Sequence, residues 1–402
     1  MSWKKVFLGS LYELPSRNGL TRPSKVRGVG YKMVNMGELF ANEWLYDIPM
    51  ERVQLNDREK RECLIAKNDL LFARQSLVAS GAGKCSIVRE VKEPTTFESH
   101  LIRVRLDTTK AVPLFYYYYF KSPLSPMKTI VTICAQAGIR GSDLATLSVE
   151  CPDLPTQRRI ASILSAYDDL IENNRRQIKL LEEAAQRLYR EWFVELRFPG
   201  HEGVKVVDGV PEGWMKGTVD NIVKLLSGYP FKSSEYVSSG KYRLITIKNV
   251  KDGEFSPDNV DYIDQLPDKV PSHCILTEGD ILLSLTGNIG RVCIVNGYNY
   301  LLNQRVAKLQ TFHPAYAYCM FRSKEMLNKM TALSNGVAQQ NLSPIRAEKI
   351  RILIPSSNLL FQFKNIVEPI ISQIILLNNQ ITFACEARDR LLPELMDGEM
   401  EV

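Results

Sequence analysis

The sequence predicts an α+β protein made of two similar globular domains and two long helices that form an antiparallel coiled coil with pseudo-two-fold symmetry. Two observations carry this prediction. An apolar heptad stripe, with steps that alternate four and three, occurs twice along the chain. Blocks of similar sequence precede each copy in the same order, which indicates an internal duplication. A single stripe is typical of a helix lying on a core, but two matching stripes can bury each other, so we expect an intramolecular helix pair.

The first stripe lies between Leu154 and Phe193, and the second follows it at an offset of 203 residues. Asn174 of the first stripe aligns with Leu377 of the second. A polar seam residue can fix the register of a helix pair, although a tolerated imperfection is the alternative. The predicted seam residues are Ile160, Leu164, Tyr167, Ile171, Asn174, Ile178, Leu181, Ala185, Leu188 and Trp192 in the first copy, and Phe363, Val367, Ile370, Ile374, Leu377, Ile381, Ala384, Arg388, Leu391 and Leu395 in the second.

The segments before the stripes repeat as well. Trp3 aligns with Trp214 and Asp69 with Asp280, both at an offset of 211, and the later blocks follow at slightly smaller offsets. Five matched blocks in one order predict a duplication of about two hundred residues. The predicted organisation is a first globular domain at residues 1–153, a long helix at 154–197, a linker at 198–210, a second globular domain at 211–355, and a second long helix with a C-terminal tail at 356–402.

Within the first domain, residues 69–72, 86–88 and 101–106 read as short strands between polar turns. Residues 113–120 read as an aromatic helix that begins at a proline. Its four consecutive tyrosines, residues 116–119, point all round the helix, so packing is favoured over a stacking platform for a ligand. In the second long helix, Pro393 is expected to end or kink the helix.

The composition is that of an ordinary globular protein, with 45% hydrophobic and 24% charged residues and a net charge of +6. No run of eighteen apolar residues occurs, and the first residues lack the apolar stretch of a signal peptide, so we expect a cytoplasmic protein without a membrane segment. The eight cysteines show neither a Cys-x-x-Cys pair nor histidine partners. The sequence therefore predicts reduced thiols in the core, with no disulfide framework and no metal site.

Motifs for catalysis are weak. The chain has no Pro-Pro pair, which an adenine methyltransferase needs at the end of its catalytic strand. Residues 81–85 resemble part of a phosphate-binding loop, but the first glycine is absent and Cys85 replaces the Ser or Thr that would hold magnesium. Asp69, Glu90 and Lys92 could form a nuclease site, yet the second copy keeps only the aspartate. A turn or strand-start role for Asp69 and Asp280 is therefore favoured, and no cofactor is expected in this chain.

Binding residues are easier to find than catalytic ones. A basic run with no acid from Arg17 to Lys32 lies in what reads as an exposed loop, where a merely solvated role is the alternative. The second domain has four loop-type stretches rich in Asn, Gln and Arg, which can bond base edges, although such stretches also form ordinary turns. The candidate DNA-binding residues are Arg17, Arg22, Lys25, Arg27, Lys32, Arg74 and Lys84 in the first domain, and Tyr229, Lys232, Arg243, Lys248, Thr286, Asn288, Arg291, Asn303, Gln304, Arg305, Gln339, Gln340 and Asn341 in the second.

Three segments together resemble the specificity subunit of type I restriction-modification enzymes. They are residues 155–160 at the start of the first helix, the Val-Pro-Glu-Gly-Trp stretch at 210–214, and residues 388–396 at the end of the second helix. The likeness extends over essentially the whole chain. Two segments depart from the family pattern. Residues 359–362 lack the usual sequence at the start of the second helix. Residues 141–144 differ from residues 339–342, so the role of a loop in one half does not carry over directly to the other half.

The resemblance implies a subunit that is not an enzyme. Each target-recognition domain is expected to read one half of a split, asymmetric sequence in double-stranded DNA, with the helices as a spacer between the halves. The helices are also expected to dock two methyltransferase subunits, which bring S-adenosylmethionine, and the full complex adds ATP-driven restriction subunits. A protein-binding scaffold assembled through its coiled coil is the main alternative, and a nuclease working through Asp69 is a third interpretation.

Overall fold

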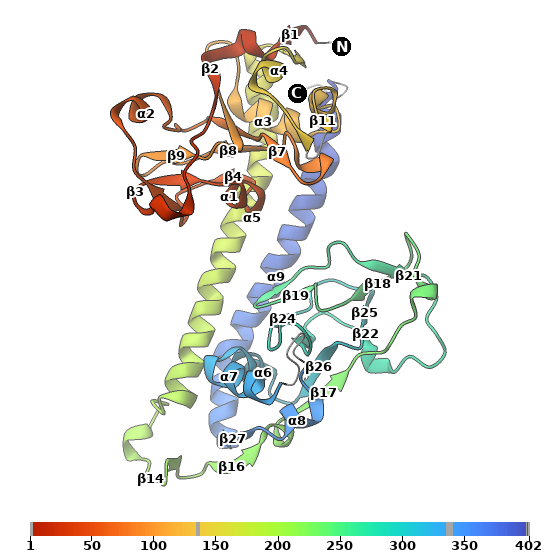
Figure 1. Ribbon diagram of the computed structural model, residues 1–402. Helices are drawn as coiled ribbons and strands as arrows, with labels where there is room; N and C mark the ends of the chain where they lie inside the picture. The colour runs from red at the N-terminus through yellow and green to blue at the C-terminus, as the bar shows by residue number, and fades with distance from the viewer. Residues whose placement is uncertain (1–2, 134–136, 335–340, 399, 401–402) are drawn as a thin grey trace. The chain divides into compact units, whose positions relative to one another are not determined.

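The computed structural model describes residues 3–133, 137–334, 341–398 and 400 (Figure 1). Their contacts divide the chain into two compact units. Unit 1 comprises Met1–Leu170 and Ala384–Val402, and unit 2 comprises Ile171–Phe383. Each unit is a β-rich domain that also contains a part of each of the two long helices, α5 (Leu154–Tyr189) and α9 (Ser357–Met396).

Unit 1 is built around a five-stranded sheet with the order β2-β10-β6-β8-β4 and a three-stranded sheet with the order β5-β3-β9. Smaller sheets pair β1 with β13 and join β11, β12 and β7. Its strands are β1 (Lys5–Phe7), β2 (Tyr12–Asn18), β3 (Arg27–Val34), β4 (Trp44–Leu45), β5 (Glu51–Val53), β6 (Leu70–Ala73), β7 (Gln75–Ser76), β8 (Cys85–Val88), β9 (Thr95–Phe97), β10 (Leu101–Leu106), β11 (Thr132–Ile133), β12 (Ala137–Gly138) and β13 (Ser148–Glu150). Its short helices are α1 (Met36–Ala41), α2 (Asp57–Glu62), α3 (Pro113–Lys121) and α4 (Gly141–Ala145).

Unit 2 has two four-stranded sheets, with the orders β17-β26-β23-β24 and β21-β18-β25-β22, and the pairs β14-β15, β16-β27 and β19-β20. Its strands are β14 (Val206–Val207), β15 (Val210–Pro211), β16 (Met215–Thr218), β17 (Val223–Ser227), β18 (Tyr242–Ile245), β19 (Val250–Lys251), β20 (Glu254–Phe255), β21 (Asp261–Ile263), β22 (Ile275–Leu276), β23 (Ile281–Ser284), β24 (Val292–Ile294), β25 (Tyr300–Leu302), β26 (Val306–Thr311) and β27 (Arg351–Ile354). Its short helices are α6 (Pro314–Arg322), α7 (Lys324–Leu333) and α8 (Pro344–Glu348).

The sheets of the two units repeat each other. The antiparallel order β2-β10-β6-β8 corresponds to β17-β26-β23-β24, and unit 1 adds the parallel strand β4 at one edge. The centre of the smaller sheet repeats too, because β3 pairs antiparallel with β5 and parallel with β9, as β18 does with β21 and β25. The predicted fold class, with two similar domains and two long helices, is confirmed.

The long helices complete the cores of both units. In unit 1 the aromatic helix α3 packs with Ile160 and Leu164 of α5 and with Leu395 of α9. In unit 2 helix α6 packs with Ala185 of α5 and with Phe363 of α9. Within unit 2, Asn174 of α5 bonds to Gln380 of α9, and Trp192, farther along the chain, contacts Phe363, so residue numbers rise along α5 as they fall along α9. The two helices therefore run antiparallel there.

The tyrosine run at 116–119 is buried on all sides, which confirms packing over a ligand platform. Pro393 does not end the helix, because α9 continues past it to Met396, and a kink at Pro393 stays a prediction. The helix also contains Pro369 in its interior, where a proline removes one backbone hydrogen bond. Burial of the neighbouring Val367 in the core of unit 2 helps to hold the helix together there.

Helix α9 is long and apolar enough, by length and composition alone, to cross a membrane. The same test is passed by the core helix of a soluble protein, and α9 buries Phe363, Val367 and Leu395 inside the two units. This feature is therefore weak evidence for a membrane segment.

Replacing Phe363 by Ala should destabilise unit 2 by about 3 to 5 kcal/mol, because a buried phenylalanine leaves a cavity when it is truncated. Phe363 is fully buried and its ring contacts the rings of Trp192 and Phe193. Hydrogen exchange of the α6 amides in the full chain measures the loss. Phe361, two residues away and 61% exposed, is the matched control, and Phe361→Ala should change the protection by no more than about 0.5 kcal/mol. Equal effects of the two changes would show that α9 does not close this core.

Candidate functional site

Four loop stretches that are far apart in the sequence come together in unit 2. The amide of Leu285 donates to the carbonyl oxygen of Arg305 at 3.0 Å, and the amide of Leu342 donates to that of Leu285 at 2.8 Å. Thr286 adds a side-chain bond, because its hydroxyl donates to Asn341 Oδ1 at 3.0 Å. A parallel bridge between Tyr229 and Asn303 brings in the fourth stretch. We call these residues, 228–233, 286–291, 303–305 and 341, the loop surface of unit 2.

The loop surface presents polar side chains to solvent. Asn288, Gln304, Arg305 and Asn341 are exposed, whereas Thr286 is buried. Gly287 has a φ of +73°, and a side chain there would be strained, so the turn that presents Asn288 depends on this glycine. The surface thus presents the side-chain amides of Asn and Gln residues together with the guanidinium of Arg305. These are the groups that form hydrogen bonds with base edges in DNA.

Basic residues accompany these loops. Lys232 and Lys248 are exposed, and Arg291 is half-buried, with its guanidinium beside the side-chain amide of Asn288. Arg243 is also half-buried and lies over the ring of Tyr300 at 4.5 Å, so its guanidinium is held in place by a cation–π contact. The predicted residues Gln339 and Gln340 lie outside the described residues.

The basic run of unit 1 differs from the predicted exposed loop. Arg17 belongs to β2, while Arg27 and Lys32 belong to β3, so the loop assignment is wrong for these three residues. The cause is strand pairing, since β2 pairs with β10, and β3 pairs with β5 and β9. Acids from residues 47–62 and 93 also pair with the cations of this run. Arg17 pairs with Glu62 at 2.5 Å, Arg22 with Glu59 at 2.6 Å, Arg27 with Glu51, and Lys32 with Asp47 and Glu93.

These ion pairs change what the run offers to DNA. A phosphate would have to compete with a carboxylate for each of the four paired cations, which lowers the gain from binding. Lys25 is exposed in the same segment. The other two candidates of unit 1 also have intramolecular partners, since Arg74 donates to the carbonyl oxygen of Ser99 at 3.3 Å and Lys84 to that of Phe40 at 3.1 Å.

The seam candidates are buried to different degrees. Ile160, Leu164, Ile171, Asn174, Phe363, Val367, Ile374 and Leu377 are buried, whereas Tyr167, Ile178, Leu181, Leu188, Ile370, Ile381 and Leu391 are half-buried. Asn174 Nδ2 donates to Gln380 Oε1 at 3.0 Å within unit 2, so a polar bond crosses the helix pair at this position. The geometry fits the register role that a polar seam residue can take.

Two buried carboxylates on α5 were missed by sequence reasoning. Asp168 and Glu182 each follow a predicted seam residue by one position, and they are 5% and 8% exposed. Their spacing of fourteen residues equals two heptads, which places them on the same side of the helix. That spacing is the signal that would have identified them as a pair.

In unit 1, Asp168 is the centre of a charged cluster. Its Oδ1 contacts Arg388 Nη1 of α9 at 2.5 Å, and its Oδ2 accepts a hydrogen bond from the hydroxyl of Tyr118 at 2.5 Å. Arg388 also pairs with Asp389 of the same helix at 2.7 Å and approaches Glu43 at 3.5 Å. Burial, followed by the charge of Asp168, raises the pKa of Tyr118, so the hydroxyl stays a proton donor.

In unit 2, Glu182 occupies a similar centre with different partners. It pairs with Arg322 at the end of α6 and accepts a hydrogen bond from the hydroxyl of Tyr318. Arg322 Nε also contacts Asp252 at 3.0 Å. Burial raises the pKa of Glu182, and the charge of Arg322 opposes this shift. Both clusters therefore consist of a carboxylate from α5, an arginine and a tyrosine.

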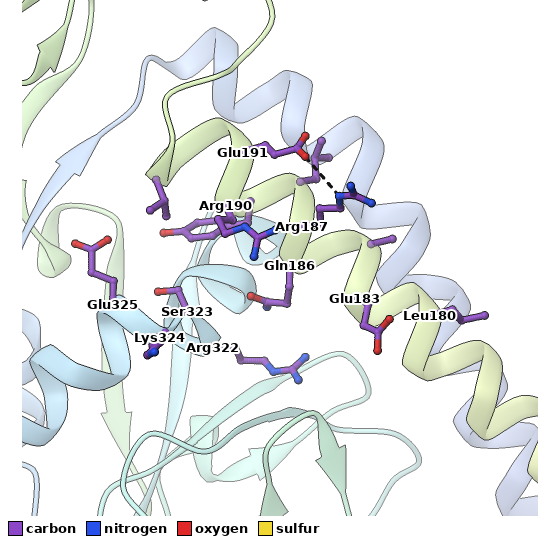
Figure 2. Close-up of a pocket in the computed structure, with 14 residues that line it drawn as sticks. Leu180, Glu183, Gln186, Arg187, Arg190, Glu191, Arg322, Ser323, Lys324 and Glu325 are labelled. Atoms are coloured by element: carbon purple, nitrogen blue, oxygen red, sulfur yellow. Dashed lines mark ion pairs between the residues drawn. The ribbon is translucent and has the colours of Figure 1, made fainter. Parts of the chain in front are cut away.

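A groove of about 850 Å³ lies in unit 2 between α5 and the start of α7 (Figure 2). Figure 2 shows Gln186 and Arg187 on the α5 side, with Arg322 and Lys324 across from them. Leu180, which lies at one end, is 65% exposed. Both acidic and basic side chains line the groove, and the buried Gln186 Nε2 has no hydrogen-bond partner among the described residues.

The nuclease interpretation finds no support in the geometry. Asp69 is fully buried, pairs with Arg105 at 2.7 Å and accepts a bond from the amide of Ala66 at 2.7 Å. Asp280 repeats the turn with the amide of Thr277 at 2.8 Å, which fits the turn role predicted for both aspartates. Among the described residues, no group of three or more His, Cys, Asp or Glu side chains is placed to hold a metal ion.

The family follows from comparison with known proteins. The family model "Type I restriction modification DNA specificity domain" matches residues 1–183 and 211–382. The chain therefore belongs to the specificity subunits of type I restriction-modification systems.

Relatives of this class cover nearly the whole chain. The MjaIX specificity subunit of Methanocaldococcus jannaschii is 25% identical over 400 residues, which cover 96% of this chain and 90% of that protein. The HindI specificity subunit of Haemophilus influenzae is 21% identical over 466 residues, with 99% of both chains covered. A crystal structure of the S subunit from M. genitalium has a TM-score of 0.60 at 17% identity and covers 98% of this chain and 96% of that one, so it has the same fold.

Replacing Glu182 by Gln should destabilise the packing of α6 on α5 by on the order of 3 kcal/mol, because the buried Arg322 loses its buried counter-charge. Hydrogen exchange of α6 amides in the full chain measures this loss. The neighbouring Glu183 is the matched control, since its side chain is 62% exposed and lies 4.0 Å from Lys179. Glu183→Gln should change the stability by no more than about 0.5 kcal/mol. Full protection in the Glu182→Gln variant would mean that the cluster contributes nothing to this contact.

Proposed function

We propose that this chain is the non-catalytic DNA-reading subunit of a type I restriction-modification complex. Residues 1–153 and 211–355 act as target-recognition domains, and each reads one half of a bipartite, asymmetric sequence in double-stranded DNA. The observation that supports this most directly is the loop surface of unit 2, where Asn288, Gln304 and Arg305 are exposed together. Family membership supplies the context for this surface.

Recognition on this proposal combines two kinds of contact. Asn and Gln bond adenine through two groups, Arg bonds guanine in the same way, and Lys or Arg elsewhere contacts phosphates. In unit 2, Asn288, Gln304 and Arg305 take the first role, with Lys232 and Lys248 in the second. In unit 1, the paired cations from Arg17 to Lys32 contact DNA phosphates only after the phosphates displace their carboxylate partners. Lys25 contacts a phosphate directly.

The chemistry is supplied by partner subunits. Two methyltransferase subunits bind S-adenosylmethionine and modify adenines, and ATP-dependent restriction subunits cleave DNA in the larger complex. Helices α5 and α9 are the proposed docking surface. The exposed apolar side chains Leu180, Leu376 and Phe383 support this proposal, since apolar groups exposed on a helix pair are typical of a contact surface.

The helices also act as the spacer between the two half-sites. Helix α5 contains 36 residues and therefore measures about 54 Å at 1.5 Å per residue. It belongs to unit 1 up to Leu170 and to unit 2 from Ile171 without a break in the helix. On this proposal, the continuous helix sets the spacing that the reading of two separated half-sites requires.

The decisive test is single-molecule sequencing of methylated adenines in cells that express this chain with its methyltransferase partner. A bipartite motif with a fixed gap, present only when this chain is expressed, is the expected result. Cells with the methyltransferase alone are the control. The absence of any new motif, with a soluble and active complex, would instead favour a protein-binding scaffold.

The same assay tests the loop surface. Arg305→Ala should relax the sequence preference in one half-site and leave the other half-site unchanged, because a bidentate contact contributes about 1 to 3 kcal/mol to discrimination against a wrong base. Lys205, exposed in the linker, is the control, and Lys205→Ala should leave the motif as it is. A change in both half-sites would show that the domains do not read independently.

The spacer role predicts a defined change in the target. Inserting one heptad at matched points of α5 and α9 should lengthen the gap between the half-sites while each half-site keeps its sequence. Sequencing of methylated adenines again gives the motif. An unaltered gap in a soluble complex would contradict the spacer role of the helices.

A further inference from the structure

The two buried charge clusters are not copies of each other, although the chain is duplicated. At the offset of 203 residues, Arg388 aligns with Ala185, Asp168 with Ile371, and Glu182 with Cys385. In unit 1 the carboxylate comes from α5 and the arginine from α9. In unit 2 the carboxylate again comes from α5, but the arginine comes from α6. Helix α5 thus supplies the carboxylate at the centre of both clusters.

We propose that these charges make the helix pair selective, so that each half of this chain pairs with the other half and rejects a second copy of itself. We call residues 1–208 the first half and residues 209–402 the second half. Because the halves are duplicates, each carries a helix that could occupy the place of its counterpart. The apolar seam alone does not discriminate between these partners, since apolar side chains face the pair in both helices.

A pair of two second halves would bury arginines without carboxylates. The place of Ala185 beside α6 would be taken by Arg388, and that of Glu182 by Cys385. Arg322 would keep only Asp252, whose side chain is 60% exposed, and Arg388 would face Ile371 where Asp168 stands in unit 1. Arg388 would bring only Asp389, whose side chain is 62% exposed. Each such unit would therefore bury two guanidinium groups with no buried counter-charge, which is strongly unfavourable.

A pair of two first halves is less unfavourable than a pair of two second halves, but it still loses the ion pair between Asp168 and Arg388. Glu182 would take the place of Cys385 near α3, where Tyr117 and Lys121 align with Tyr318 and Arg322. The hydroxyl of Tyr117 is buried there without a hydrogen-bond partner among the described residues, so Glu182 would find a donor. Asp168, however, would face Ala185 in place of Arg388 and would keep only the hydroxyl of Tyr118.

The bond between Asn174 and Gln380 does not disfavour a pair of two first halves. Gln177 aligns with Gln380, so a pair of two first halves would offer Asn174 the same kind of partner. Selection therefore rests on Asp168 with Arg388 and on Glu182 with Arg322. Each broken pair should shift the pairing equilibrium by on the order of a hundredfold or more, since an unpaired buried charge remains. This inference does not depend on the proposed DNA-reading function.

The test uses the full chain with a protease site inserted at the exposed turn Asp208–Gly209, which joins β14 to β15. Cleavage after folding leaves the two halves associated without a covalent link. Nicked protein is mixed with isotope-labelled nicked protein, and the urea concentration is raised until pairs with one labelled and one unlabelled half form. These pairs show that the halves have exchanged partners. Native mass spectrometry then counts pairs of first with second halves, of two first halves and of two second halves.

Pairs of a first half with a second half alone are expected for the unaltered sequence. Homopairs near the statistical share would overturn the proposal. In the Arg388→Ala variant, Asp168 is unpaired in the heteropair as well, so homopairs of the first half should rise from undetectable to readily measured. Arg390→Ala, an exposed position on the same helix turn, is the matched control and should leave the distribution unchanged. The same distribution in the Arg388→Ala and Arg390→Ala variants would also overturn the proposal.

Discussion

Neither domain of this protein closes its own core. In unit 1 the apolar face of α3 and the main sheet are covered by the start of α5 and the end of α9, and in unit 2 the apolar face of α6 is covered by the end of α5 and the start of α9. Apolar surface that is not covered in this way would face water, which costs about 25 cal/mol per Å². The helix pair is therefore part of each core as well as the connection between the domains.

This constraint explains why charged residues are tolerated next to the seam. A helix that must cover two different cores carries an apolar face along its whole length, and such a face alone is permissive about partner and register. Asp168 and Glu182 are buried where α5 packs against α3 and α6, respectively. Each carboxylate contacts an arginine and accepts a hydrogen bond from a tyrosine hydroxyl. Buried pairs of this kind contribute little net stability, but they make any arrangement that separates the partners costly.

Much of the fold was predictable from the sequence because it depends on periodicity and repetition. The heptad stripes and the repeated blocks predicted two domains and an antiparallel helix pair, and the turn role expected for Asp69 and Asp280 agrees with their amide contacts. Contacts between distant segments were not predictable. The basic run from Arg17 to Lys32 contains no acid, yet four of its cations pair with acids folded against it from elsewhere.

The candidate site also depends on contacts between segments that are distant in the sequence. Each loop stretch of unit 2 could be singled out by its amide and arginine content, but only backbone bonds such as those of Leu285 to Arg305 and Leu342 bring the stretches onto one surface. Pro393 does not end α9, because Leu395 and Met396 beyond it are buried in the core of unit 1. Local chemistry identifies candidates, and tertiary contacts decide which of them share a surface.

The duplicated halves share their sheets and helix packing but differ in their loops. The strand order of the main sheet and the packing of α3 or α6 on the helix pair recur in both units, since both cores are closed by the same two helices. The loops are under no such constraint, and they differ: unit 1 presents basic residues neutralised by acids, whereas unit 2 presents exposed Asn288, Gln304 and Arg305. A duplicated frame with unlike surfaces suits a target whose two halves differ in sequence. On the proposed function, the asymmetry of the DNA target arises from the loops and its fixed spacing from the shared helices.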